Sequence, residues 1–364
     1  MAAVIDEYLH ELVLVGASDL HLKAGHRPTM RLQGDLKRMD FPVLSPEDYH
    51  SMIMELLNED RRERLNNFKE VDLSYNVPGL ARFRVNLFWQ RGQIGAVFRV
   101  IPFLIKTIDE LEMPEVCKSL ALLPRGLILV TGPTGSGKST SLAAIVDYIN
   151  TTKRLHVMTV EDPIEYVHTD KMSVINQREL ATDTHTFTDA LRHVMRQNPD
   201  VILVGEMRDL ETIQLAITAA ETGHLVFSTL HTVDSAQTID RIVDVFPPDQ
   251  QAQIRTQLSI TLQGIVSQTL LPLTSGDGRV AAFEVMVATP AIRTIIRDGK
   301  THALYHDLQT GAALGMQTLD GSLIRLLQQQ KIDYEHALAK CSNPPEFRRR
   351  AESLGLAEVL AAAN

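Results

Sequence analysis

Gly132-Pro-Thr-Gly-Ser-Gly-Lys-Ser139 follows the apolar run Leu127-Ile-Leu-Val-Thr131 and precedes a segment with apolar residues at helical spacing. The glycine-rich stretch matches G-x-x-x-x-G-K-[ST], and its place between a strand and a helix is the context of a phosphate-binding loop. Glycines let main-chain N–H groups approach phosphate oxygens closely, and the helix N-terminus adds a favourable dipole. The alternative, a purely structural glycine-rich turn, is disfavoured by this context.

Two side chains of this loop predict how it handles a nucleotide. Lys138 is placed to hold the β and γ phosphates of ATP, and the Ser139 hydroxyl is placed to ligate Mg²⁺. ATP and Mg²⁺ are therefore the expected cofactors. The candidate nucleotide contacts in the loop are Gly132, Pro133, Thr134, Gly135, Ser136, Gly137, Lys138, Ser139 and Thr140.

Three more apolar runs follow the loop, at residues 156–160, 201–204 and 225–230, and helical patterns separate several of them. Apolar strands that alternate with helices predict a mainly parallel sheet covered on both faces, an α/β fold. After Pro247 the pattern predicts mostly helices, with one further strand at residues 280–287.

Carboxylates follow two of the expected strands. Glu206 ends Asp200-Val-Ile-Leu-Val-Gly-Glu206, where such ATPases hold Mg²⁺ or its water shell; because Glu is longer than the usual Asp, we expect a contact through water. Glu161, Asp162 and Glu165 follow the strand at 156–160, and one of them is expected to orient or deprotonate the attacking water. The residues alone leave open which one acts, and each taken alone is equally well explained as a solvated loop acid.

His231 follows the run at 225–230, at the same expected sheet edge, where it could sense the γ phosphate. A structural histidine is the alternative. Arg208 follows Glu206 closely, while Arg192 and Arg196 are expected on one face of a single helix, opposite an apolar stripe. Arginines in these places can stabilise the charge that develops during phosphoryl transfer.

The first 100 residues predict a smaller α+β domain. A helix is expected at residues 4–15, short antiparallel strands at Asp19–Lys23 and 29–36, and a helix after the capping box Ser45-Pro-Glu-Asp48. Residues 81–101 alternate between apolar and polar residues and predict a β-hairpin. The hairpin carries Arg84 and Arg99, and exposure to solvent is a sufficient explanation for charged residues at these two positions. We expect a domain at 1–100, a linker at 101–111 and a second domain at 112–364.

Composition excludes several classes of protein. The chain has 364 residues, 44% of them hydrophobic, and one core stops growing near about 250 to 300 residues, so two folded domains are expected. Its two cysteines form no Cys-x-x-Cys pair, which disfavours structural zinc and disulfides and favours a reducing cytoplasm. The longest uncharged stretch, residues 256–276, is too rich in Gln, Thr and Ser for an integral membrane segment.

The chain resembles the secretion and type IV pilus ATPase superfamily, and within it the PilT-type pilus retraction ATPases. The resemblance rests on the phosphate loop and on Glu161-Asp-Pro-Ile-Glu165, Gly205-Glu-Met-Arg-Asp209 and Ser228-Thr-Leu-His231, in that order. It extends to Ala17-Ser-Asp-Leu-His-Leu22, Arg82-Phe-Arg-Val-Asn86 and Gly311-Ala-Ala-Leu-Gly-Met-Gln317.

This resemblance implies a PAS-like N-terminal domain, a RecA-like ATPase domain with added C-terminal helices, and a homohexameric ring with ATP between the two domains. It implies ATP hydrolysis that powers pilus retraction and twitching motility, with an inner-membrane platform protein as partner and a cytoplasmic location at that membrane. It makes Lys138 and Ser139 the Walker A pair, Glu206 the Walker B acid and His231 part of the His box, and we choose Glu165 as general base. Arg84 and Arg99 match arginines that reach the nucleotide.

One segment departs from the family pattern. Retraction enzymes carry Ala-Ile-Arg-Asn-Leu-Ile-Arg-Glu, and this chain has Ala291-Ile-Arg-Thr-Ile-Ile-Arg-Asp298, which leaves an accessory retraction paralogue open. We expect Arg293 and Arg297, four residues apart, to couple ATP turnover to pilus disassembly, with a solvated helix face as the alternative. Extension and secretion ATPases usually carry a four-cysteine zinc module, which two cysteines cannot build.

Two readings from other classes also remain open. A RecA-like nucleic-acid motor would share the loop and sheet, but the net charge of -9, the single Trp and the 5% aromatic content disfavour it. A nucleotide switch that does not hydrolyse ATP is disfavoured by the full set of acidic segments.

Overall fold

The computed structural model describes residues 4–32, 34–101, 104–276 and 278–356 of the chain. The chain divides into two compact units, residues 1–104 and 105–364. The division falls within residues 101–111, the segment expected as a linker, and Ile108 from this segment is buried in the core of the second unit.

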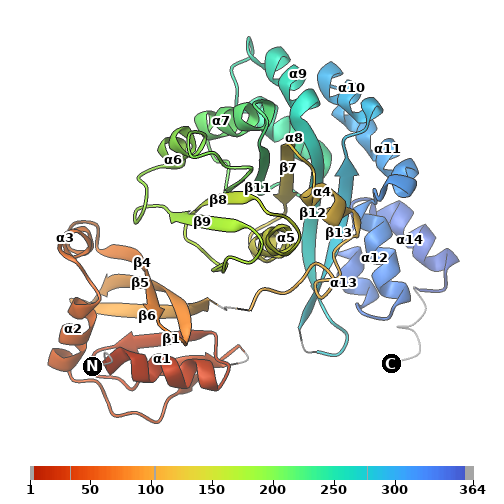
Figure 1. Cartoon of the computed structure of the whole chain (residues 1–364). Helices are drawn as coiled ribbons and strands as arrows, with labels where there is room; N and C mark the ends of the chain where they lie inside the picture. Colours follow the sequence, from red (N-terminus) through yellow and green to blue (C-terminus); the bar gives the residue numbers. More distant parts are fainter. Residues whose placement is uncertain (1–3, 33, 102–103, 277, 357–364) are drawn as a thin grey trace. The chain divides into compact units, whose positions relative to one another are not determined.

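Among its described residues, the first unit has a six-stranded antiparallel sheet and three helices. Figure 1 shows these elements. Alternate strand residues such as Leu20, Phe83 and Phe98 are buried with apolar residues of the helices, so the sheet has one covered face. Its strands, in the spatial order β3-β2-β1-β6-β5-β4, are β1 (Asp19–Lys23), β2 (Thr29–Leu32), β3 (Asp35–Arg38), β4 (Glu70–Val77), β5 (Ala81–Gln90) and β6 (Gln93–Ile101). The helices are α1 (Val4–Leu14), α2 (Pro46–Glu55) and α3 (Glu59–Phe68).

The hairpin and the capped helix are present as predicted. Ser45 accepts a hydrogen bond from the Asp48 main-chain N–H at 3.1 Å and so caps α2. The strand expected at 29–36 is two strands, because Gly34 turns the chain with φ of +92°. Helix α3 and strand β4 were not predicted; α3 buries Leu65 but has no apolar stripe to reveal it.

The second unit is built on the predicted α/β sheet. Five neighbouring parallel pairings give the order β12-β7-β11-β10-β8-β9, and β13 pairs antiparallel with β12 at one edge. The strands are β7 (Gly126–Thr131), β8 (His156–Glu161), β9 (Val174–Glu179), β10 (Val201–Val204), β11 (Leu225–Leu230), β12 (Leu262–Pro272) and β13 (Arg279–Val287).

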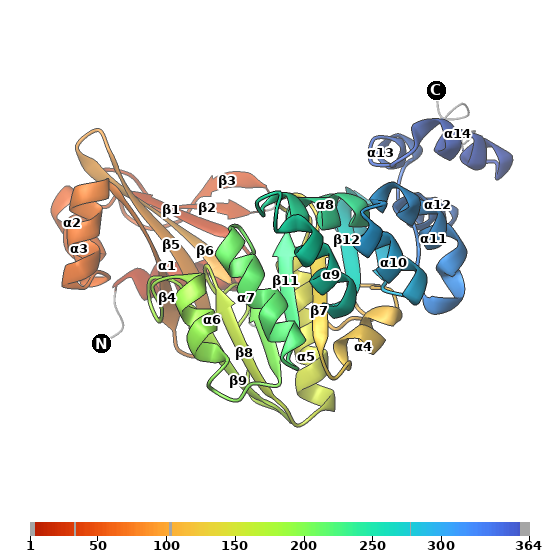
Figure 2. The same ribbon diagram turned by 90° about the horizontal axis from the view of Figure 1, so that it is seen from above.

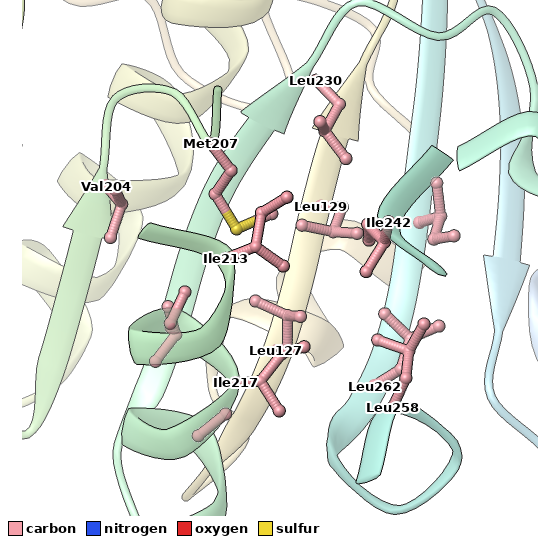
Figure 3. Close-up of a cluster of buried hydrophobic side chains, with 14 of the residues drawn as sticks. Leu127, Leu129, Val204, Met207, Ile213, Ile217, Leu230, Ile242, Leu258 and Leu262 are labelled. Atoms are coloured by element: carbon pink, nitrogen blue, oxygen red, sulfur yellow. The ribbon is translucent and has the colours of Figure 1, made fainter. Parts of the chain in front are cut away.

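Helices cover both faces of this sheet (Figure 2). Figure 3 shows Leu127 and Leu129 of β7 facing Ile213 and Ile217 of α7 (Leu210–Glu221). The intervening residue Ile128 points to the other face, where it packs in a cluster with residues of α4 and α5. The remaining helices against the sheet are α4 (Val116–Ala121), α5 (Lys138–Thr152), α6 (Phe187–Val194), α8 (Ser235–Asp244) and α9 (Gln251–Thr261).

The prediction of mostly helices after Pro247 is wrong for one long strand. Strand β12 occupies much of the uncharged stretch 256–276, and its consecutive polar residues Ser267, Gln268 and Thr269 are buried. These polar residues interrupted the apolar pattern, so the strand left no clear signal. Strand β9, at the opposite edge of the sheet, was missed because its residues are mostly half-exposed and polar.

The predicted C-terminal helices are present. Those within residues 319–353 form a separate cluster against the β12–β13 hairpin, whereas those within residues 290–310 pack in the main core of the sheet through residues such as Ile292 and Leu304. Leu271 and Val280 of the hairpin are buried with Leu323, Ile324 and other helical residues. The helices are α10 (Pro290–Asp298), α11 (Leu304–Thr310), α12 (Leu319–Gln328), α13 (Tyr334–Leu338) and α14 (Pro344–Ser353). In the described parts of the chain, each helix is too short or too polar to cross a bilayer.

Candidate nucleotide-binding site

The sheet brings four predicted segments to one edge. β7, β8, β10 and β11 run parallel, so their carboxyl ends lie on the same side, and these ends lead into the phosphate loop (residues 132–140), the acidic segment (residues 161–165), Glu206 and His231. This is the edge at which open α/β sheets bind ligands. The strands β7, β10 and β11 are fully buried, so they form a fixed base for the segments that follow them.

The phosphate loop needs glycine at two positions for different reasons. At Gly132, with φ of +143°, a Cβ would lie 2.6 Å from Ser136 Oγ and closer still to the Gln268 main-chain oxygen. At Gly137, the N-cap of α5, the chain is left-handed with φ of +89°. The loop surface is open, because Pro133, Thr134 and Gly135 are exposed, while Ser136 is buried and Ser139 and Thr140 are half-buried.

Lys138 is folded back onto the loop. Its Nζ donates to the main-chain oxygens of Gly132 at 2.8 Å and Pro133 at 3.1 Å. Burial lowers the pKa of the Lys138 ammonium, and the carboxylates of Glu206 and Glu165 oppose this shift. Lys138, Glu165 and Glu206 are thus close enough to interact electrostatically, which the sequence predicted only from their place at strand ends.

Glu206 has a cationic or protonatable partner at each oxygen. Arg208 Nη2 lies 2.8 Å from Oε2, and His231 Nε2 lies 3.0 Å from Oε1. The loop that carries Glu206 is fixed to β11, because Thr229 Oγ1 donates to the Gly205 main-chain oxygen at 2.6 Å. The structure therefore brings His231 to the segment that carries Glu206 and Arg208, although the sequence placed it more than twenty residues later.

The three acids of the acidic segment differ in their surroundings. Glu161 accepts hydrogen bonds from Thr159 Oγ1 at 2.6 Å and Gln177 Nε2 at 3.1 Å, and burial raises the pKa of its carboxyl. Asp162 and Glu165 are exposed. A partly buried, doubly hydrogen-bonded acid is held in place, whereas an exposed acid is free to meet water.

Sequence reasoning missed two residues that contact the phosphate loop. Tyr166, directly after the acidic segment, has its hydroxyl 2.9 Å from Thr140 Oγ1, and Gln268 of β12 reaches Ser136. The position of Tyr166 beside Glu165 was the available signal. Gln268 had none, because its strand was not recognised.

The candidate arginines are dispersed. Arg99 pairs with Asp19 at 2.7 Å and Arg84 lies 3.8 Å from Asp72, all within the first unit. Arg192 forms an ion pair with Glu211 of α7. The prediction that Arg192 and Arg196 share one helix face is wrong, because α6 ends at Val194.

Arg293 and Arg297 also have different surroundings, although they are four residues apart on α10. Arg293 Nη1 donates to the main-chain oxygens of Ser259 at 2.7 Å and Ile260 at 2.8 Å, in the last turn of α9. Arg297 is exposed. Arg293 therefore holds the end of another helix, and the expectation that both arginines form one coupling surface is not supported for Arg293.

The oxygen groups at this edge fit Mg²⁺. Ser139 offers a hydroxyl and Glu206 a half-buried carboxylate, which are hard oxygen donors. Among the described residues, no group of three or more His, Cys, Asp and Glu side chains is placed to hold a metal ion by itself. Mg²⁺ does not need such a group, because it usually keeps several waters and binds one or two protein ligands together with substrate phosphates.

The fold and the site define a P-loop ATPase of the RecA-like type. The chain belongs to the Type II/IV secretion system protein family, whose model matches residues 1–325. It is 54% identical over 332 residues to the type IV pilus retraction ATPase PilT of Pseudomonas aeruginosa, covering 91% of this chain and 96% of that protein. It is 40% identical over 343 residues to the type IV pilus ATPase PilU of the same organism, covering 94% and 90%.

A solved structure agrees with these relatives. The chain matches the crystal structure of the pilus retraction motor PilT with bound ADP at a TM-score of 0.89 and 48% identity, covering 94% of this chain and 98% of that one.

Proposed function

We propose that this chain is a motor ATPase that hydrolyses ATP to ADP and phosphate and uses the energy to retract type IV pili. The observation that carries the ATPase part is the meeting of Lys138, Glu165, Glu206 and His231 at one sheet edge beside the phosphate loop. The retraction part is supported by the identity of 54% to a retraction ATPase across 91% of the chain.

In the proposed site, the loop N–H groups and Lys138 would hold the phosphates, and Ser139 and Glu206 would hold Mg²⁺, Glu206 through water. When bound, the ion would supply positive charge that offsets the charge of the phosphates. Lys138 must leave its main-chain acceptors to reach a phosphate, since its Nζ now bonds Gly132 and Pro133.

We assign the general base to Glu165. It is exposed and close enough to Lys138 to affect the lysine electrostatically, whereas Glu161 is held by two hydrogen bonds. His231 and Arg208 bracket Glu206 and are proposed to respond when the γ phosphate and metal arrive. Arg84 and Arg99 remain proposed nucleotide contacts on the family pattern alone. Arg192 and Arg196 remain proposed contacts because an arginine can stabilise the charge that develops during phosphoryl transfer.

The assembly is proposed as a homohexamer of two-domain subunits, divided near residues 101–111. We further propose that the ring acts at the cytoplasmic side of the inner membrane on a pilus platform protein, and thereby supports twitching motility. Interdomain movement driven by ATP would be passed to that platform.

The first experiment separates nucleotide binding from hydrolysis. Lys138→Ala is expected to lose both, while Glu206→Gln keeps ADP binding and loses at least about 100-fold in turnover, the usual effect of removing an electrostatic group at such a site. Wild-type turnover in purified Glu206→Gln would contradict the site assignment. Single-turnover hydrolysis of ATP by the wild-type protein would exclude the alternative function, a nucleotide switch that does not hydrolyse ATP.

The second experiment addresses the biological role. Deletion of the gene is expected to leave cells with pili that do not retract; loss of pili would instead indicate extension. Because identity to PilU is lower, at 40%, we favour the main retraction motor over an accessory one. Salt-sensitive stimulation of turnover by single-stranded DNA would support a nucleic-acid motor.

A further inference from the structure

We propose that Gln268 is a positioning residue of the nucleotide site, and that its side-chain amide holds the phosphate loop in the shape that receives phosphates. Gln268 Nε2 donates to the main-chain oxygen of Ser136 at 2.6 Å. The Gln268 side chain is buried, with 3% of the residue exposed, so this hydrogen bond is shielded from water.

Gln268 touches the loop at more than one point. Its main-chain oxygen is so close to Gly132 that a Cβ there would collide with it, and its Nε2 would be 3.2 Å from a Cβ at Gly137. The residue therefore lies between the first and last glycines of the loop and bonds the carbonyl that precedes Gly137. Its position constrains both the entry and the exit of the loop.

The length of β12 explains how a distant residue reaches this place. β12 pairs with β7 up to the partners Ser267 and Thr131, where β7 ends and the phosphate loop begins. The two side chains also bond, Thr131 Oγ1 donating to Ser267 Oγ at 2.8 Å. β12 continues beyond this point, paired with β13 through Gln268 and Phe283, so Gln268 stands on a braced strand beside the loop.

Two buried polar atoms at this contact lack partners. Among the described residues, Ser136 Oγ and Gln268 Oε1 have no hydrogen-bond partner. Unsatisfied buried polar atoms are uncommon in native proteins and call for an explanation. The acceptor end of the Gln268 amide is therefore unpaired, and the hydrogen bond that its donor end makes to the Ser136 carbonyl is the polar contact by which this side chain holds the loop.

The expected consequence is on phosphate affinity and not on the chemical step. The loop binds phosphate through converging main-chain N–H groups, and a small displacement of such groups weakens all of these bonds together. Without the Gln268 donor, the hydrogen bond that holds the Ser136 carbonyl in its inward orientation is lost. The loop then samples other shapes, and binding must select the competent one.

The test is Gln268→Met, which keeps a similar length and removes the donor. Titration with a fluorescent ADP analogue is expected to show about a tenfold rise in Kd, equivalent to about 1.4 kcal/mol. KM for ATP should rise by a similar factor, while kcat stays within about twofold. Inorganic pyrophosphate should compete less well against the analogue in the variant, because the defect lies in the phosphate subsite.

Gln214→Met is the matched control, since Gln214 is exposed on α7 and outside the site; it should bind ADP as the wild type does. Thermal unfolding without nucleotide identifies a purely structural effect: a lower Tm with unchanged Kd and KM would overturn the proposal. If Gln268→Met does not fold, Gln268→Leu serves, because it is shorter, carries no charge and cannot donate to the carbonyl. Unchanged ADP affinity in folded Gln268→Leu would equally overturn it.

This inference rests on nucleotide binding in the proposed function and not on pilus retraction. A wild-type chain that fails to bind ADP would refute the proposed function itself. Wild-type binding together with unaltered binding in the Gln268 variants would refute only the role of Gln268.

Discussion

His231 Nε2 lies 3.0 Å from Glu206 Oε1, and the two residues follow the adjacent parallel strands β11 and β10. Strand pairing therefore fixes the separation of their main chains, and the hydrogen bond from Thr229 of β11 to Gly205 fixes the loop that carries Glu206. We propose that this imidazole, held against the proposed metal-binding acid, responds to the γ phosphate and its metal.

We expect His231→Asn to lower kcat for ATP by about 100-fold, a typical effect of losing one electrostatic group beside developing charge. KM should change little, since the phosphate loop is untouched. His224→Asn is the matched control. His224 directly precedes β11, at the amino end of the strand and away from the site, and its ring bonds the Ala219 main-chain oxygen. Equal losses in steady-state turnover for the two variants would contradict a role for His231 at the site.

Two glycines of the phosphate loop should respond differently to alanine. At Gly132 a Cβ meets the Gln268 main chain and Ser136 Oγ, so Gly132→Ala must displace the loop and should abolish measurable ADP binding. At Gly135, with φ of +77°, nothing lies within 4 Å of a Cβ, and only the backbone preference is lost. Gly135→Ala should therefore cost about 1 to 2 kcal/mol and keep binding. Titration with ADP and thermal unfolding distinguish the two; strong binding by Gly132→Ala would refute the close approach.

Apolar patterning predicted the central strands of the second unit and the residues that follow them. It succeeded because the central residues of β7, β8, β10 and β11 are buried and include runs of Val, Leu, Ile, Met and Phe. It failed at β12, where Ser267 and Gln268 are buried yet polar because they bond Thr131 and the phosphate loop. The same polar groups that hid the strand are those that contact the site.

Other contacts depend on tertiary geometry that a sequence does not display. The partner of Arg293 is the end of α9, more than thirty residues earlier in the chain. The spacing of Arg293 and Arg297 suggested a shared face, but Arg293 bonds the end of α9 whereas Arg297 is exposed. Likewise, Arg196 has helical spacing from Arg192, but the helix ends two residues before it.

Arg293→Ala should destabilise the second unit, because α9 loses a cation and hydrogen-bond donors at its last carbonyls. We expect a loss of about 2 kcal/mol and a fall in Tm of about 5 °C. Arg297→Ala, on the exposed face of α10, should leave Tm within about 1 °C.

Retraction assays should also distinguish the two arginines, but here the effect is expected for Arg297→Ala. Arg297→Ala is expected to retain ATP turnover while reducing retraction, if the exposed face of α10 couples turnover to the pilus. Retraction at the wild-type level in cells that carry Arg297→Ala would refute coupling through this residue. A stability loss in Arg297→Ala equal to that of Arg293→Ala would refute the different placement of the two.

The buried carboxyl of Glu284 should make the free energy of unfolding depend on pH. This β13 residue is buried, and its Oε1 accepts hydrogen bonds from the Ser235 main-chain N–H at 2.8 Å and the Ser235 hydroxyl at 2.7 Å. Burial raises the pKa of Glu284 from 4.5 to about 7, the Ser235 bonds oppose this shift, and the charges of Asp234 and Asp320 add to it.

Below about pH 4.5 the carboxyl is protonated in both the folded and the unfolded chain, and its contribution to stability is fully present. As pH rises toward about 7, the unfolded chain releases this proton while the folded chain retains it, so unfolding becomes more favourable. The contribution is therefore lost between about pH 4.5 and 7, by up to about 3 kcal/mol.

Glu284→Gln keeps an oxygen that can accept from Ser235 and has no proton to release. The difference in free energy of unfolding between this variant and the wild type should therefore shift in favour of the variant as pH rises from 4.5 to 7. Urea unfolding at matched ionic strength measures it at each pH. Glu335→Gln, at an exposed position of α13, should follow the wild type. A difference between Glu284→Gln and the wild type that stays constant across this range would show that Glu284 ionises equally in both states.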